Sequence, residues 1–248
     1  TTVGASLMAI EAGANIVCIC HSQELQMKAL DYIKESVESH KISIDIIDER
    51  VSRVLKFKEE LKEIDLNKEY KSVKSIVENE ETKKFSYQVV RSALSLVKGK
   101  TLDLKDNALF IGALPIATSI ADESDGSHSI IKKINKEIPS LHTMTLPIQP
   151  TPYEMDIIID AAKAHHQVIL CTYNANIFNE QIELMNKLSE LDIELHVISM
   201  RNPYDLHYAK DIKNYVCLYE YTPNSLNVLL EYLKKELVPT GIIPIKYE

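Results

Sequence analysis

The chain has 248 residues, of which 45% are hydrophobic and 26% are charged, values typical of a globular protein with a sizeable core. Its formal net charge of -8 at pH 7 argues against a generic surface for nucleic acids or anionic membranes. No apolar run approaches the roughly 18 residues of a membrane span, so we expect neither a nucleic-acid partner nor a membrane-spanning segment.

The chain opens inside a helical pattern. Apolar residues recur at helical spacing over residues 3–12, and Gly13 is suited to end that helix. Neither a charged segment nor a signal-type apolar region follows Thr1. We therefore expect that the sequence starts within a fold.

A strand and two further helices are predicted next. The run Ile16–Cys20 is short, rich in β-branched residues and bounded by turn residues, which is typical of a strand buried on both faces. Ser22 is expected to cap a helix that runs to about Ser39, and another helix starts near Ser43. This second helix carries apolar residues on one face, namely Ile47, Val51, Val54, Leu55 and Leu61. The order helix, strand, helix, helix is one unit of a parallel α/β architecture.

A change of composition separates this unit from the rest of the chain. Residues 65–84 are dense in Lys and Glu and lack long apolar runs, which is typical of a linker with partial helix. We therefore predict three parts: residues 1–63, a linker over 64–85, and a second domain over 86–248.

The second domain alternates strands with helices. A helix is predicted near 86–98, ending at Gly99. Strands are then predicted at 108–112, 167–172, 194–199 and 215–219. Helices are predicted between and after them, near 127–137, 153–165, 177–191 and 224–237. This alternation predicts a largely parallel, doubly wound sheet with helices on both faces, in three layers.

The four cysteines show no metal or redox spacing. Cys18, Cys20, Cys171 and Cys217 all lie in short apolar runs, so we expect them to be small buried hydrophobic residues. Nothing in the pattern requires disulfides, which favours a reducing compartment.

Several motifs that carry chemistry are absent or ambiguous. The chain has six glycines and neither of the Gly-rich phosphate-binding motifs, so a nucleotide or flavin site is disfavoured. His165 and His166 close the helix predicted near 153–165, where a metal site is one interpretation and a favourable interaction with the helix C-terminus is the better one. The acidic stretch 121–129 could contact a ligand, but it also suits the N-terminus of the following helix. We expect no cofactor and no metal.

His21 and Ser22 directly follow the predicted first strand. In a closed parallel barrel the carboxyl ends of the strands face the active site, so these residues are candidate substrate-binding groups at a barrel mouth. The alternative is that they form only the loop and the helix cap.

Three stretches resemble family 3 glycoside hydrolases of the β-N-acetylglucosaminidase branch. Residues 9–22 (AIEAGANIVCICHS) and 42–55 (ISIDIIDERVSRVL) resemble the last strand and helices of the family's TIM-type barrel. Residues 201–206 (RNPYDL), 219–222 (YEYT) and 239–245 (PTGIIPI) resemble its second, α/β-sandwich domain. The resemblance covers nearly the whole chain.

The resemblance implies a retaining exo-hydrolase that removes terminal β-linked N-acetylglucosamine from cell-wall fragments such as muropeptides. In this family the nucleophile and the acid/base lie on barrel loops upstream of Thr1, and no position here matches either motif, so no catalytic residue is assigned. The partners implied are an N-acetylglucosamine-containing glycan and the protein's own amino-terminal barrel. The residues alone leave one other class open, a non-catalytic module that docks on a barrel or binds cell wall; the absence of Trp argues against an independent carbohydrate-binding module.

Overall fold

The structure, a computed structural model, describes residues 1–20, 22–61, 70–114 and 129–246. These residues fall into two compact units, Thr1–Val73 and Lys74–Glu248. None of the helices in these ranges combines the length and the apolar character that a bilayer crossing requires.

The described residues among 1–61 of the first unit form three helices whose starts follow from capping residues. They are α1 (Thr2–Glu11), α2 (Gln23–Glu38) and α3 (Ile44–Glu60). The side chains of Thr1, Ser22 and Ser43 each accept a hydrogen bond from a backbone N–H of the first helical turn, which satisfies an otherwise unpaired donor. The three predicted helices are thereby confirmed.

The predicted strand at residues 16–20 is wrong for this chain. These residues form no strand, Ile16 is 65% exposed, and Cys18 and Cys20 are exposed rather than buried. A strand needs a hydrogen-bonded neighbour, and no other strand is found among the described residues of the first unit. Cys171 and Cys217, which lie on paired strands, are buried as predicted.

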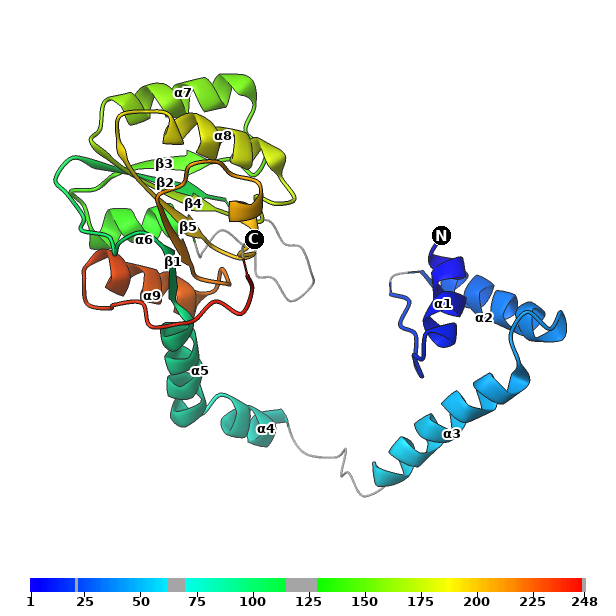
Figure 1. The fold of residues 1–248 in the computed structure, drawn as a ribbon. Helices are drawn as coiled ribbons and strands as arrows, with labels where there is room; N and C mark the ends of the chain where they lie inside the picture. Colours follow the sequence, from blue (N-terminus) through cyan, green and yellow to red (C-terminus); the bar gives the residue numbers. More distant parts are fainter. Residues whose placement is uncertain (21, 62–69, 115–128, 247–248) are drawn as a thin grey trace. The chain divides into compact units, whose positions relative to one another are not determined.

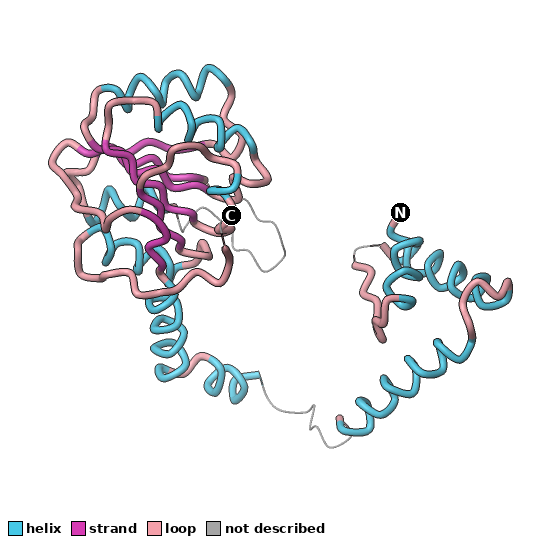
Figure 2. The backbone as a smooth tube through the Cα atoms, in the orientation of Figure 1, coloured by secondary structure: helices cyan, strands magenta, loops and turns pink. Residues whose placement is uncertain are grey.

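The second unit is built around a six-stranded sheet in the order β1-β6-β5-β4-β2-β3 (Figure 2, magenta). Its strands are β1 (Ser95–Lys98), β2 (Ala108–Ala113), β3 (His142–Leu146), β4 (Gln167–Thr172), β5 (Glu194–Ser199) and β6 (Asn214–Cys217). All neighbouring strands are parallel except β1 and β6, which are antiparallel. The predicted doubly wound sheet is therefore confirmed.

Helices cover both faces of this sheet. Those that follow the strands are α6 (Ile130–Glu137), α7 (Pro152–Lys163), α8 (Asn179–Ser189) and α9 (Pro223–Leu233). Figure 1 shows α7 and α8 on one face and α6 and α9 on the other. Before the sheet, α4 (Tyr70–Val77) leads to α5 (Glu80–Ala93), which packs on α9. Every residue of β2 and β4 is buried, as expected for central strands with two covered faces.

Two elements at the edges of the sheet differ from the prediction. The helix expected to end at Gly99 ends at Ala93, because Ser95–Lys98 pairs with the free edge of β6. Strand β3 was not predicted: it is an edge strand with one fully buried residue, Leu146, and so has no continuous apolar run. Both segments are strands because each pairs with a strand that is distant in the sequence, β1 with β6 and β3 with β2.

Candidate functional site

The sheet has a topological switch point at β2. From β2 the chain passes first to β3 on one side and then to β4 on the other. Open parallel sheets bind ligands beyond the carboxyl ends of their strands at such a point. The segment that follows β4 flanks this point, and the segments that follow β5 and β6 lie at the same end of the sheet, so functional side chains are expected there.

A buried carboxyl group lies in this region. Asp205, the first residue of the short 3₁₀ helix η1 (Asp205–His207), is fully buried. Its Oδ2 accepts a hydrogen bond from Oγ1 of Thr172 at 2.6 Å, and its Oδ1 accepts one from the backbone N–H of Asn176 at 3.3 Å. Burial raises the pKa of Asp205 from 3.8 to about 6, and the two hydrogen bonds oppose this only in part. Asp205 therefore exchanges a proton at mildly acidic pH.

An arginine and two tyrosines lie at the same edge. Nη1 of Arg201 donates to Oη of Tyr173 at 3.1 Å, and the guanidinium lies 5.8 Å from the centre of that ring. The rings of Tyr173 and Tyr221 meet edge to face at 6.1 Å. Oη of Tyr221 accepts from the backbone N–H of Ile130 at 2.9 Å, and burial raises its pKa to about 12. These contacts tie the ends of β4, β5 and β6 to the start of α6.

Two asparagines in the turn after β4 present side-chain oxygens with no hydrogen-bond donor among the described residues. The Oδ1 atoms of Asn174 and Asn176 are both buried. Asn174 has φ +52°, a left-handed conformation that asparagine tolerates, and its backbone carbonyl closes the turn by accepting from Ile177 and Phe178. Buried polar atoms are normally paired, so these oxygens are available acceptors for polar recognition.

The side chains just described at the carboxyl ends of β4, β5 and β6 are better suited to binding a polar ligand than to acid–base catalysis by themselves. Within the part of the chain that the structure describes, Asp205 is the only carboxyl group whose pKa is clearly raised. Retaining glycoside hydrolysis needs two groups, a nucleophile and an acid/base, held around one bond. No group of three or more His, Cys, Asp or Glu side chains that could hold a metal ion occurs among the described residues.

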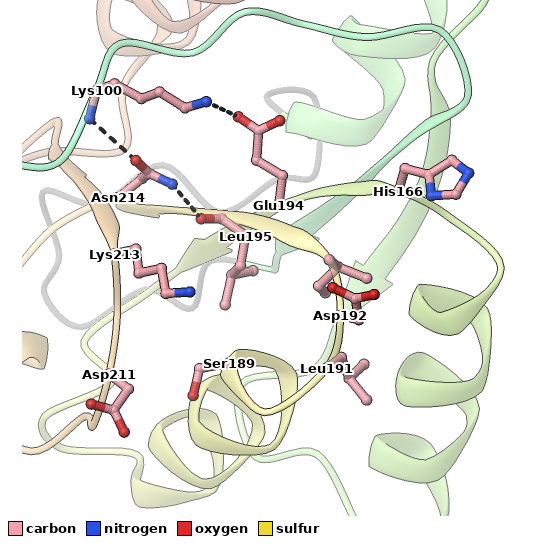
Figure 3. A pocket seen from close by; sticks show the side chains of 11 residues that line it. Lys100, His166, Ser189, Leu191, Asp192, Glu194, Leu195, Asp211, Lys213 and Asn214 are labelled. Atoms are coloured by element: carbon pink, nitrogen blue, oxygen red, sulfur yellow. Dashed lines mark hydrogen bonds and ion pairs between the residues drawn. The ribbon is translucent and has the colours of Figure 1, made fainter.

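A hollow of about 600 Å³ lies at the opposite end of the strands, beside the amino ends of β5 and β6 (Figure 3). Lys100 and Glu194 form an ion pair at 3.0 Å, and Glu194 also lies 3.0 Å from Nε2 of the buried His196. A hydrogen bond from His196 lowers the pKa of Glu194, while burial lowers the pKa of His196. The side chain of Asn214 accepts from the backbone N–H of Lys100 and donates to the carbonyl of Leu195. These contacts link the side chains to one another at the amino ends of β5 and β6, which is typical of a structural role, while the buried Nδ1 of His196 has no hydrogen-bond partner among the described residues.

The residues predicted from sequence as binding groups are placed only in part. His21 and the acidic residues 121–128 lie outside the described residues. Oγ of Ser22 accepts a hydrogen bond from the backbone N–H of Leu25 at 3.2 Å, which agrees with the alternative that Ser22 caps the helix. His165 follows α7 and lies beside His142. The role of His21 and Ser22 in substrate binding stays a prediction.

Sequence reasoning missed Tyr173, Asn174 and Asn176. The signal that could have found them is position, since the stretch from Thr172 to Asn176 directly follows the carboxyl end of a central strand beside the switch point.

The sequence matches no family model and no curated protein. Solved structures do match. A family 3 β-N-acetylglucosaminidase from Paenibacillus sp. str. FPU-7 shares 24% identity with a TM-score of 0.71, over 98% of this chain and 47% of that chain. The chain has the fold of the C-terminal part of a family 3 glycoside hydrolase.

Two further structures share this family 3 fold. A fungal multi-domain family 3 β-N-acetylglucosaminidase shares 20% identity with a TM-score of 0.65, over 98% of this chain and 28% of that chain. A β-glucoside phosphorylase shares 16% identity with a TM-score of 0.59, over 99% of this chain and 46% of that chain. The chain thus spans about half the length of the Paenibacillus enzyme, and less of the fungal one.

Proposed function

We propose that the chain is the C-terminal part of a retaining exo-β-N-acetylglucosaminidase of glycoside hydrolase family 3. Its substrates are terminal β-linked N-acetylglucosamine residues of cell-wall fragments, such as muropeptides, or of related glycans. The observation that carries the proposal is the fold match to a β-N-acetylglucosaminidase over 98% of the chain, which includes both units. The stretches 9–22, 42–55 and 201–206, which resemble the same branch of the family, support it.

The nucleophile and the acid/base are proposed to lie in a barrel that precedes residues 1–63, so that residues 1–248 alone are inactive. Asp205, whose pKa is raised and which is the only such carboxyl group in the described ranges, is enclosed by Thr172 and Asn176. It does not by itself meet the need for two groups about 5 Å apart.

The first unit supports the existence of such a barrel because it leaves an apolar face uncovered. Ile16, Val51 and Leu55 are 65%, 48% and 57% exposed. An apolar hollow of about 400 Å³ runs along this face, between residues 10–16 and the helix α3. Large exposed apolar patches mark interfaces, and we propose that the remaining strands and helices of the barrel cover this one.

The protein that contains residues 1–248 together with the preceding domain is expected to hydrolyse an aryl β-N-acetylglucosaminide. The first product observed by proton NMR is expected to keep the β configuration, because a retaining enzyme inverts the anomeric carbon twice. Residues 1–248 alone are expected to release no aglycone above the buffer rate, and an aryl β-glucoside serves as the substrate control.

Turnover by residues 1–248 at the rate of the longer protein would contradict the proposed location of the catalytic groups. An inactive longer protein that binds peptidoglycan would favour the accessory-module alternative instead.

Leu55→Asp is expected to destabilise the longer protein by about 2 kcal/mol or more, because it places an unpaired charge in the proposed barrel interface. Ser52→Asp is the matched control, since it adds the same charge at an exposed position of α3. In residues 1–248 alone, where Leu55 is exposed, the two variants are expected to differ by less than about 0.5 kcal/mol. Thermal denaturation of both proteins checks this. Equal midpoints for the two variants of the longer protein would show that no partner covers this face.

A further inference from the structure

Two histidines from different elements of the second unit meet at its surface. His142 is the first residue of β3 and is exposed, and His165 lies in the turn between α7 and β4. Nδ1 of His142 and Nε2 of His165 are 2.9 Å apart, and the ring planes are nearly perpendicular, at 89°. The two nitrogen atoms therefore point at one another.

A backbone carbonyl determines the tautomer of His165. Nδ1 of His165 lies 2.8 Å from the carbonyl oxygen of Ala161, which can only accept a hydrogen bond. Nδ1 therefore carries the proton, and the neutral ring presents a lone pair on Nε2 toward His142. The same arrangement, in which the remote ring N–H donates to a backbone carbonyl, orients histidine ligands in metal sites.

The spacing of the two nitrogens is close to that required around one metal ion. Two imidazole nitrogens bound to tetrahedral zinc at about 2.0–2.1 Å are about 3.3 Å apart. An opening of about 0.4 Å from the observed 2.9 Å gives this separation, and both rings also turn so that their lone pairs converge on the ion instead of facing one another. In the pair, Nδ1 of His142 donates its proton to Nε2 of His165. To bind a metal ion, His142 would release this proton from Nδ1 and carry one on Nε2 instead, a change of tautomer that leaves both rings neutral.

We propose that His142 and His165 form a binding site for a divalent transition-metal ion such as Zn²⁺. Imidazole nitrogen is a preferred ligand of these ions. Because no third His, Cys, Asp or Glu joins the pair among the described residues, water or an external ligand completes the coordination. The site is distinct from the cluster around Asp205, which follows the carboxyl ends of β4 and β5, whereas His142 begins β3 and His165 precedes β4.

Zinc binding to the full 248-residue chain, measured by calorimetry at about pH 7.5, tests the proposal. Cys18→Ser and Cys20→Ser are introduced throughout, because both cysteines are exposed and would themselves bind zinc. One equivalent of zinc is expected to bind to this protein. His142→Ala and His165→Ala are each expected to weaken that binding by more than about tenfold. His166→Ala is the matched control: His166 is exposed, adjacent in sequence, and lines the separate hollow of Figure 3.

The result that overturns the proposal is zinc binding that is absent, or that is equally strong in the His142→Ala and His165→Ala variants and in the control. Nitrogen-15 NMR of the imidazole rings provides a second measurement that does not depend on affinity. Zinc is expected to move the ring proton of His142 from Nδ1 to Nε2 and to leave that of His165 on Nδ1. An unchanged tautomer of His142 in the presence of excess zinc would also refute the site.

Discussion

Asp205→Asn is expected to stabilise the protein at pH 7.5 by up to about 3 kcal/mol. Folding raises the pKa of Asp205 from 3.8 to about 6, a shift of roughly two units, and each unit corresponds to about 1.4 kcal/mol. The folded state therefore binds the proton more tightly than the unfolded state. The stabilisation from Asp205 is fully present below pH 3.8 and is lost as the pH rises through about 6.

Asparagine reproduces the protonated acid at this position. Its Oδ1 can accept from the backbone N–H of Asn176 as before, and its Nδ2 can donate to Oγ1 of Thr172, which replaces the present hydrogen bond by one of opposite direction. The variant is therefore expected to lose the part of the pH dependence of stability that lies between about pH 4 and pH 6.

Chemical denaturation of the second unit at a series of pH values measures this effect. Asp106→Asn is the control, because Asp106 is exposed and its replacement is expected to change stability by less than about 0.5 kcal/mol. If Asp205→Asn destabilised the protein at pH 7.5 by more than about 1 kcal/mol, the carboxylate would be favoured in its charged form, contrary to the effect of its burial.

Gly99→Ala is expected to destabilise the second unit by about 2–4 kcal/mol. Gly99 follows β1 with φ +79°, a conformation that residues with a side chain rarely adopt. A methyl group there would collide with the carbonyl oxygen of Lys213 and with Oδ1 of Asn214. That amide also binds the backbone of Lys100 and Leu195, so the collision would disturb the start of β6.

Urea denaturation of the variant checks the cost of this collision. Lys98→Ala is the neighbouring control, since Lys98 is exposed at the end of β1 and its replacement alters no backbone conformation. A loss of less than about 1 kcal/mol for Gly99→Ala would indicate that the chain between β1 and β2 relaxes to relieve the contact.

The candidate site shows which of its features local sequence patterns can predict and which they cannot. The stretch following β4 was missed, although its position was a usable signal, because the rule for parallel sheets depends only on strand order. The burial of Asp205 was not predictable from its neighbours Tyr204 and Leu206. It results from the packing of η1 against Thr172 and Asn176, which lie about thirty residues earlier in the chain.

The histidine pair is a similar case. His165 was recognisable in the sequence as a residue after a helix, where a favourable interaction with the helix C-terminus was the better reading. Its neighbour His142 is 23 residues away and belongs to an edge strand that the sequence did not reveal. Only the parallel pairing of β3 and β4 on either side of β2 brings the two rings together.

The sequence by itself determined the helices with their capping residues, the central strands and the doubly wound class, because these depend on side-chain periodicity and short-range hydrogen bonds. It also predicted the family 3 fold that the solved structures share. Tertiary structure alone decided the elements whose state depends on a neighbour. Ser95–Lys98 became a strand because β6 offered a free edge, whereas Ile16–Cys20 formed none because no described strand of the first unit lies beside it. A helix satisfies its own backbone, but a strand is completed only by a partner from elsewhere in the protein.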